Sequence, residues 1–279
     1  GLALASLDMF ESGAFSADAG NPLRADATKL KQLTVADLER GFQVGPDNPL
    51  VGLEGRVALL RRLGEVVAAK PEIFGAKDSP RPGGLFDQLA TDAIGTRIQA
   101  ADILQQVLLQ LGQIWPSRLT LQGIALGDCW RHASVVTDDA TTGLVPLHKL
   151  SQWLSYSLIE PLQRAGLEVA DIDGLTGLAE YRNGGLFVDG GVLLLRDPAD
   201  AGRAHAVDSP LVVEWRALTV ALLDRLAELI RQRTGQTPEQ LPLARILEGG
   251  SWAAGRKLAF ARRPDGSPPL TIISDGTVF

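Results

Sequence analysis

The residues best suited to chemistry lie in a glycine-rich stretch, residues 175–192. Glu180, Tyr181 and Arg182 stand side by side there, and two Gly-Gly pairs follow them. Burying a carboxylate or a guanidinium is costly unless each group finds a partner. Glycine lets the backbone approach another backbone or a ligand where a Cβ would clash. The stretch therefore predicts the wall of a pocket, with a buried structural ion pair near a turn as the alternative.

A second pair of charges, Glu214 and Arg216, interrupts a segment that is otherwise apolar on nearly every side. A helix that is apolar all round is buried, and two side chains two residues apart on it cannot pair with each other. We therefore predict that Arg182 pairs with Glu214 and that Glu180 pairs with Arg216. A purely structural network is the alternative. In the functional version, one carboxylate with a tuned pKa faces a cavity and activates water or stabilises positive charge on a sugar ring.

A thiol and an imidazole lie three residues apart in the run Asp128-Cys129-Trp130-Arg131-His132. Cys129 and His132 are the residue types of a nucleophile and its base. The alternative is a buried cysteine, with Arg131 or His132 binding a ligand or an internal carboxylate. The three histidines and the single cysteine show no metal-ligand spacing, so the sequence predicts neither a metal nor another cofactor.

A carboxylate stands beside a double glycine again in residues 247–252, where Trp252 follows Glu248 by four positions and Arg256 and Lys257 come next. An aromatic face beside a carboxylate suits a planar base or urea group and a ribose. The alternative is a helix C-cap with a core tryptophan. There is no phosphate-binding P-loop and no Gly-x-Gly-x-x-Gly after a strand, so triphosphate or dinucleotide chemistry is not indicated.

Composition limits the possible partners of the chain. Its 279 residues suffice for one large domain or two small ones, and 33 acidic against 27 basic residues give a formal charge of −6. That balance disfavours nucleic acid as a partner, although a local basic pocket for one small phosphate is compatible with it. One cysteine fits a reducing, cytoplasmic setting. No apolar run approaches the roughly 18 residues of a membrane helix, so no membrane partner is expected.

Periodic apolar residues and capping signals predict a mainly α-helical chain with short extended segments. Helices are expected over residues 1–12, 35–40, 53–69, 85–111 (one or two, bent near Gly95), 146–162, 210–233 and 242–247, with extended segments at 118–127 and 270–273. We find no repeat and no clear linker, which favours a single helical domain over residues 1–279. The chain starts inside a helical pattern, so we expect the N-terminal part of a longer protein to be missing.

Six blocks that together span the chain resemble the uracil-catabolism protein family of fungi and bacteria, long described as a domain of unknown function. The blocks are residues 54–64, 128–132, 143–153, 175–185, 213–216 and 272–278. The resemblance implies that about the N-terminal third of the family protein is absent here. It also implies a role in a route that converts uracil to a nucleotide, opens the ring and releases urea and ribose phosphate. The step in need of an enzyme is cleavage of the N-ribosyl bond of a ribosylurea-type intermediate.

A more distant resemblance is to the queuosine salvage family, helical N-glycosidases related in shape to DNA glycosylases. That family has Leu-Thr-x-Phe-Ala-Asp-Tyr-Arg where residues 175–182 read Leu-Thr-Gly-Leu-Ala-Glu-Tyr-Arg. It has Glu-x-Arg at Glu214 and Arg216, and an Asp followed by a Trp four residues on at Glu248 and Trp252. The resemblance implies a similar all-α fold.

By this match, Glu180 falls on an active-site carboxylate and Arg182 on its neighbour. One position departs from the pattern. A second family aspartate, five residues after the glutamine matched by Gln152, would fall at Ser157. The acid–base arrangement of the family therefore cannot be carried over whole.

These observations predict an N-ribosyl hydrolase that acts on a small phosphorylated ribosyl substrate, such as ribosylurea phosphate. The catalytic candidates are Glu180, Arg182, Glu214 and Glu248, and the substrate-binding candidates are Tyr181, Arg216, Trp252, Arg131, His132, His148, Arg256 and Lys257. Glu180 would stabilise an oxocarbenium-like ribose and orient or deprotonate water. Arg131, Arg256 and Lys257 are candidates for the phosphate.

Two other functions remain open from the sequence. One is a non-catalytic ribose-phosphate-binding or complex-forming protein of the same route. The other is an amidohydrolase or deaminase acting on the ureido group, although the lack of a metal signature disfavours it. The sequence sets neither the exact substrate nor the oligomeric state.

Overall fold

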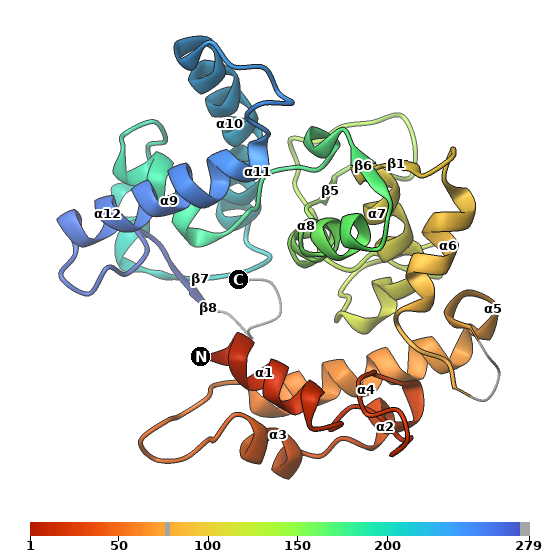
Figure 1. Cartoon of the computed structure of the whole chain (residues 1–279). Coiled ribbons are helices and arrows are strands. Elements are labelled where there is room, and N and C mark those ends of the chain that lie inside the picture. The colour runs from red at the N-terminus through yellow and green to blue at the C-terminus, as the bar shows by residue number, and fades with distance from the viewer. Residues whose placement is uncertain (76–78, 274–279) are drawn as a thin grey trace. The chain divides into compact units, whose positions relative to one another are not determined.

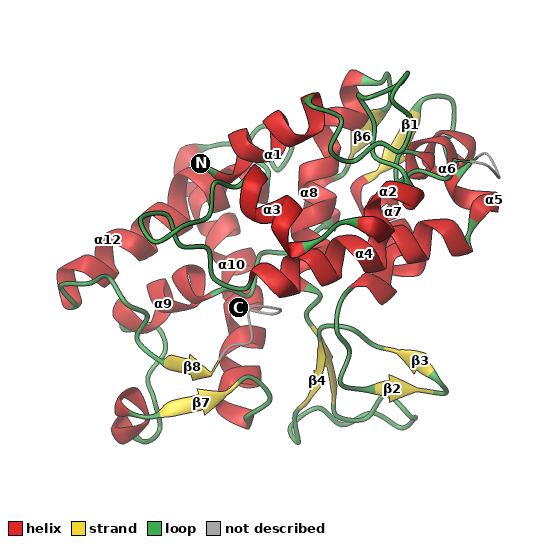
Figure 2. Ribbon diagram, turned by 90° about the horizontal axis from the view of Figure 1, so that it is seen from below, coloured by secondary structure: helices red, strands yellow, loops and turns green. Residues whose placement is uncertain are grey.

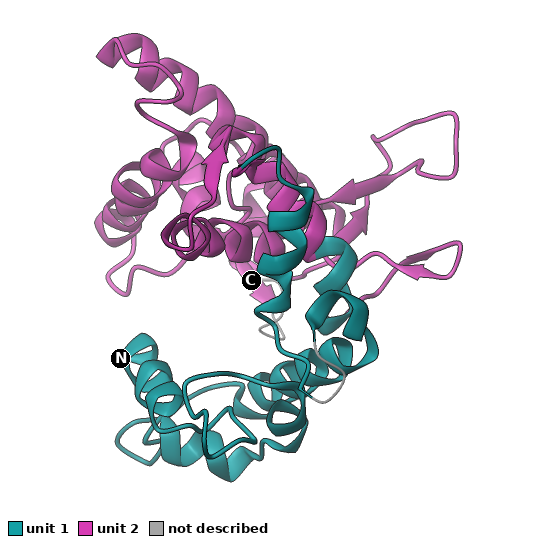
Figure 3. Ribbon diagram, turned by 45° about the vertical axis from the view of Figure 1, so that its right-hand side comes forward, with its two compact units in different colours: residues 1–95, 108–115 teal, residues 96–107, 116–279 magenta. Residues whose placement is uncertain are grey.

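The computed structural model describes residues 1–75 and 79–273. The chain is mainly α-helical with short strands, as the sequence predicts (Figures 1 and 2). It divides into two compact units, which we call unit 1 (Gly1–Gly95 and Leu108–Trp115) and unit 2 (Thr96–Val107 and the chain from Pro116 onward) (Figure 3). The single domain expected from the sequence stays a prediction. Within the described residues, every helix is too short or too polar to cross a membrane.

Unit 1 consists of helices. They are α1 (Leu2–Glu11), α2 (Ala27–Gln32), α3 (Val35–Gly41), α4 (Leu53–Ala69), α5 (Pro71–Phe74), α6 (Gly84–Asp92) and a 3-10 turn, η2 (Gly112–Ile114). Thr34 caps α3 in a capping box with Asp37, and the apolar stripe of α4 contributes Leu53 and Val57 to a core that also holds Met9 and Leu38.

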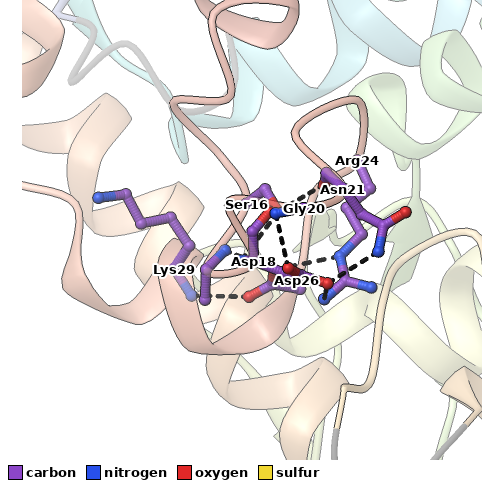
Figure 4. A network of polar contacts seen from close by, with 8 residues as sticks. Ser16, Asp18, Gly20, Asn21, Arg24, Asp26 and Lys29 are labelled. Atoms are coloured by element: carbon purple, nitrogen blue, oxygen red, sulfur yellow. Dashed lines mark hydrogen bonds and ion pairs between the residues drawn. The ribbon is translucent and has the colours of Figure 1, made fainter.

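A buried carboxylate organises the N-terminal loop of unit 1 (Figure 4). Asp26 is 1% exposed, and it caps α2 by accepting a hydrogen bond from the backbone N–H of Lys29 at 2.9 Å. Its other oxygen accepts from the N–H of Ala17 at 2.7 Å and lies 3.6 Å from Nε of Arg24. The carboxylate thus fastens the loop before α2 to the start of that helix, which is a structural role.

In its described residues, unit 2 combines helices with four two-stranded sheets. The helices are α7 (Ala100–Gln106), α8 (Lys149–Arg164), α9 (Tyr181–Asp189), α10 (Pro210–Thr234), α11 (Leu243–Ile246) and α12 (Trp252–Arg262), with a π-helical turn, η5 (Leu247–Ser251), before α12. The strands are β1 (Arg97–Gln99), β2 (Thr120–Leu121), β3 (Ile124–Ala125), β4 (Cys129–Arg131), β5 (Leu144–Pro146), β6 (Glu168–Ala170), β7 (Ala204–Ala206) and β8 (Thr271–Ile273). The pairs β1–β6 and β7–β8 are parallel, and β2–β3 and β4–β5 are antiparallel.

Helix α10 contributes residues to two apolar clusters of unit 2. Ser209 caps it, Pro210 occupies its first position, and Gly235 ends it in a left-handed conformation with φ +67°. Val213 of α10 belongs to one apolar cluster of the unit, and Leu223 belongs to a second. The helix therefore joins two parts of the core, and both parts carry segments of the candidate site.

Two expected helices differ from those observed. The break expected near Gly95 is present, but strand β1 and the separate helix α7 follow it, because Gly95 turns the chain with φ +68° and residues 97–99 pair with β6. The helix expected from Pro146 starts at Lys149, since Pro146 lies in β5 and His148 is left-handed with φ +46°. The family block at residues 272–278 lies outside the described residues after Ile273.

Candidate functional site

The side chain of Glu180 caps the N-terminus of α9. Glu180 has an extended backbone, and its carboxylate accepts hydrogen bonds from the N–H groups of Arg182 at 2.9 Å and Asn183 at 2.6 Å. A helix N-terminus has free N–H donors and a partial positive charge, both of which favour a carboxylate there. Helix α9 therefore begins where it does because Glu180 satisfies its first turn, and the same bonds fix the orientation of the carboxylate.

Two glycines let other helices approach α9 closely. A Cβ on Gly184 would lie 2.7 Å from the ring of Trp215 on α10, whose Nε1 donates to the Gly184 carbonyl at 3.1 Å. A Cβ on Gly255 of α12 would lie 2.2 Å from the carbonyl oxygen of Arg182. Helices α9 and α12 consequently run side by side (Figure 1). Gly184 of residues 175–192 and Gly255 of α12 thus allow close backbone packing around α9.

A buried ion pair of unit 2 joins Arg216 to Asp128. Arg216 is 1% exposed, and its two terminal nitrogens donate to the two carboxylate oxygens of Asp128, each at 2.8 Å. Asp128 also accepts from Nε1 of Trp130 at 2.6 Å and from the backbone N–H of Lys149 at 2.9 Å. Burial raises the pKa of Asp128, but the bonds and charge of Arg216 outweigh burial, so the pKa lies below its usual value.

Both ion pairs predicted from the sequence are wrong in their partners. The carboxylate bound by Arg216 is that of Asp128, and Glu214 lies 3.9 Å from both Nε2 of His132 and a terminal nitrogen of Arg196. The Glu214 side chain is 41% exposed, so it is not a buried group in need of an internal cation. The partner of Arg216 could not be predicted from sequence spacing, because Asp128 lies 88 residues away in the chain.

The Asp128–Arg216 pair nevertheless reaches the start of α9. Nε of Arg216 donates to the carbonyl of Ala179 at 3.3 Å, and Ala179 directly precedes Glu180. The buried pair therefore holds the backbone directly before Glu180, and the capping bonds of Glu180 hold the backbone directly after it. We expect this arrangement to fix the position of the carboxylate.

Lys149, which the sequence did not single out, lies in the electrostatic environment of Glu180. It is 6% exposed, and burial together with the charge of Arg216 lowers its pKa to about 8 against the opposing effect of Asp128 and Glu180. Burial raises the pKa of Glu180, and this effect exceeds the lowering by its backbone hydrogen bonds and by Arg182 and Lys149. A carboxylate with a raised pKa beside cations is typical of a functional group. The signal for Lys149 in the sequence is its place within residues 143–153.

Aromatic rings and guanidinium groups alternate next to Glu180. The guanidinium carbon of Arg182 lies 4.5 Å from the ring centre of Tyr181 and 4.7 Å from that of Trp252, and the guanidinium of Arg256 lies 5.1 Å from the ring centre of Trp252. These are cation–π distances. The structure therefore brings together four of the predicted site residues. Trp252 is at the surface, 36% exposed, which rules out the alternative of a core tryptophan.

Three of these four residues, Tyr181, Arg182 and Arg256, border a cavity of about 350 Å³. Tyr181, Arg182 and Gly185 of α9 line it together with Arg256, other residues of α12 and the loop that follows α12. The volume is at the lower end of the range of small-molecule sites. The cavity is thus large enough for a small ligand directly beside the residue that follows Glu180.

Glu248 and Lys257 are exposed in the described structure. Glu248 lies on η5, which is joined to the start of α9 by the hydrogen bond from Ser251 to Asn183 at 2.9 Å. Lys257 lies on α12 but does not line the cavity. Their predicted roles in ribose and phosphate binding stay predictions.

The cysteine–histidine pair gains no support from the structure. Cys129 is buried, and burial raises the pKa of its thiol, which disfavours the thiolate. Nδ1 of His132 accepts from the N–H of Ser134 at 3.2 Å, and Arg131 is exposed and donates to the Thr142 carbonyl at 2.9 Å. Burial lowers the pKa of His148. The buried cysteine is the alternative that the structure favours, and binding of substrate by the other three residues stays a prediction.

No group of three or more His, Cys, Asp or Glu side chains is arranged to hold a metal ion in residues 1–75 and 79–273. The cations that act on the carboxylate of Glu180 are Arg182 and Lys149. A carboxylate beside cations can transfer a proton or stabilise positive charge, and the cations can bind an anion.

Comparison with known proteins identifies relatives of the whole chain. The chain is 39% identical over 307 aligned residues to "Uracil catabolism protein 4" of Lachancea kluyveri, an alignment that covers all of this chain and 69% of the relative. It is 40% identical over 282 residues to "Protein urg3" of Schizosaccharomyces pombe, covering all of this chain and 67% of that protein. Residues 1–279 also match the family described as "Protein of unknown function (DUF1688)". The chain therefore belongs to the DUF1688 family, the uracil-catabolism family that its sequence blocks resemble.

Proposed function

We propose that this protein acts in uracil catabolism as an N-ribosyl hydrolase and cleaves the N-glycosidic bond of a ribosylurea phosphate or a related nucleotide-like intermediate. The observation that carries the proposal is the carboxylate of Glu180, which is held by two backbone N–H groups and has a raised pKa. The name of the relative from Lachancea kluyveri supports the pathway.

The chemistry follows from the charge that develops on the ribose. When the urea or base departs with the bonding electrons, C1′ becomes an oxocarbenium-like cation, and a carboxylate on one face stabilises it. The same carboxylate takes a proton from the attacking water, whose oxygen then bonds to C1′. The departing nitrogen takes up a proton from solvent, so that neutral urea or base is released, and Glu180 returns its proton to solvent. A raised pKa makes Glu180 a stronger base than a surface carboxylate. The hydrogen bonds by which Glu180 caps α9 hold its carboxylate in one orientation throughout the reaction.

Arg216, Asp128 and Lys149 have a supporting role in this mechanism. Arg216 holds the carbonyl that precedes Glu180, and Asp128 holds both Arg216 and the start of α8. Lys149 adds a positive charge that lowers the pKa of Glu180 and keeps more of it ionised. We regard all three as positioning residues, because none of their described contacts requires a substrate.

The test is an assay of product release by the full-length protein. Ribosylurea phosphate and uridine monophosphate are supplied separately, and urea, free base and ribose phosphate are measured. We expect one substrate to be cleaved and the Glu180→Gln variant to lose turnover while it still binds that substrate. Glu160→Gln is the matched control, since Glu160 is an exposed residue of α8 paired with Arg164. If neither substrate yields product and Glu180→Gln binds both as well as the parent, the hydrolase proposal is wrong.

A further inference from the structure

We propose that the cavity beside α9 binds the phosphate group of the substrate through the guanidinium groups of Arg182 and Arg256. This inference rests on the proposed function for the rest of the substrate, but the phosphate site itself is defined by the cavity and its charges. It assigns a phosphorylated ribose, a phosphate monoester, as the substrate class.

The guanidinium groups of Arg182 and Arg256 contact an aromatic ring. The guanidinium carbon of Arg182 lies 4.7 Å and that of Arg256 lies 5.1 Å from the ring centre of Trp252, and the N–H donors of a guanidinium lie in its plane. Among the described residues, neither arginine has a carboxylate within 4 Å of its side-chain nitrogens. Two guanidinium groups fixed by aromatic rings at one cavity are suited to a doubly charged oxyanion.

The other charges at the cavity cancel only one of these two positive charges. Asp189 also lines the cavity, but both of its oxygens are bound by Arg263, at 2.8 and 2.5 Å. Asp265 is the second carboxylate of the lining, and it is exposed and accepts from the N–H of Ser267 at 3.1 Å. Three arginines against two aspartates leave an excess positive charge, in a chain whose formal charge is −6.

Arg182 connects this cavity to the reacting carboxylate. Its side chain lines the cavity, and its backbone N–H donates to the carboxylate of Glu180 at 2.9 Å. A phosphate held at Arg182 therefore binds beside the first turn of α9, the turn that the Glu180 carboxylate caps. Arg131 is disfavoured for the phosphate, because it does not line the cavity and its guanidinium donates to Thr142.

The first test is binding measured by titration calorimetry with ribose 5-phosphate, ribose and inorganic phosphate. We expect ribose 5-phosphate to bind at least about 10-fold more tightly than ribose, and inorganic phosphate to compete with it. Arg256→Gln should weaken ribose 5-phosphate about 10- to 100-fold and leave ribose unchanged. Arg256 is exposed on α12, so this variant is expected to fold, which circular dichroism checks. Arg225→Gln, an exposed arginine of α10, is the matched control and should bind as the parent does.

The site is overturned if ribose and ribose 5-phosphate bind equally, if ribose 5-phosphate does not bind, or if Arg256→Gln binds it as the parent does. Urea release from ribosylurea phosphate separates this inference from the proposed function. Phosphate binding that depends on Arg256, without product from either ribosylurea phosphate or uridine monophosphate, supports the site and contradicts the hydrolase. Urea release with the same KM in Arg256→Gln as in the parent supports the hydrolase and contradicts the site.

Discussion

Replacing Asp128 by Asn tests the buried ion pair of unit 2. The variant keeps the size of the side chain but removes the negative charge that Arg216 binds through two hydrogen bonds of 2.8 Å. Arg216 is 1% exposed, so its charge would remain buried without a counter-charge. Removing one partner of a buried pair costs about 3–5 kcal/mol. Because the Asp128 side chain is 12% exposed and water can reach it in part, we expect a loss near 3 kcal/mol.

The measurement is urea unfolding followed by tryptophan fluorescence, which reports mainly on unit 2 because four of the five tryptophans lie there. Glu160→Gln, which breaks an exposed pair, should change the free energy of unfolding by less than about 1 kcal/mol. A loss below about 1 kcal/mol for Asp128→Asn would refute the reasoning, since the pair would then contribute no more than a surface pair.

The pH dependence provides a second check on Asp128. Its pKa in the folded protein lies below the usual 3.8, so the ionised form is favoured by folding. The corresponding stability is fully present above pH 3.8 and is lost as the pH falls toward the folded pKa. The difference between parent and Asp128→Asn should therefore shrink below about pH 4.

Three further predictions concern the surroundings of Glu180. Gly255→Ala should destabilise the protein by about 1–3 kcal/mol in urea unfolding, whereas Gly249→Ala, where a Cβ meets nothing within 4 Å, should not. The acid limb of the pH profile of kcat/KM should lie above the usual Glu pKa of 4.5. Lys149→Met should move this limb to higher pH, because the charge of Lys149 lowers the pKa of Glu180. If the limb does not move, Lys149 does not act on Glu180 in this way. Cys129→Ala should keep turnover, and Cys129 should react with a maleimide at pH 7 far more slowly than after unfolding.

The helices that local signals determine could be predicted from the sequence. Helix α4 spans residues 53–69 as its apolar periodicity predicts, and α10 starts at Pro210 and ends before Gly235, as its cap, proline and glycine indicate. Strand β1 was missed because its three residues gain their conformation from pairing with β6, a contact that no local pattern encodes.

Part of the candidate site could likewise be predicted from the sequence, and part of it could not. The stretch at residues 175–192 and the neighbourhood of Glu180 and Arg182 followed from residue types that are costly to bury. The partner of Arg216 could not be predicted, because the position of a residue on a helix defines the side on which it lies but not which distant carboxylate it contacts. The sequence presents Asp128 only as the first residue of a run that contains a cysteine and a histidine. Its structural role depends on the turn that brings it to the start of α8.

The route of the chain between the two units has a consequence for biosynthesis. Residues 96–107 belong to unit 2, yet the chain completes unit 1 at residues 108–115 before it returns. Strand β1 is therefore made about 70 residues before its partner β6, a delay of roughly 4–14 s at ribosomal rates of about 5–20 residues per second. During that time, Ile98, which is 3% exposed in the folded protein, has no strand to pair with. Unit 1 can fold on the nascent chain first, while unit 2 must wait for later synthesis to cover its earliest segment.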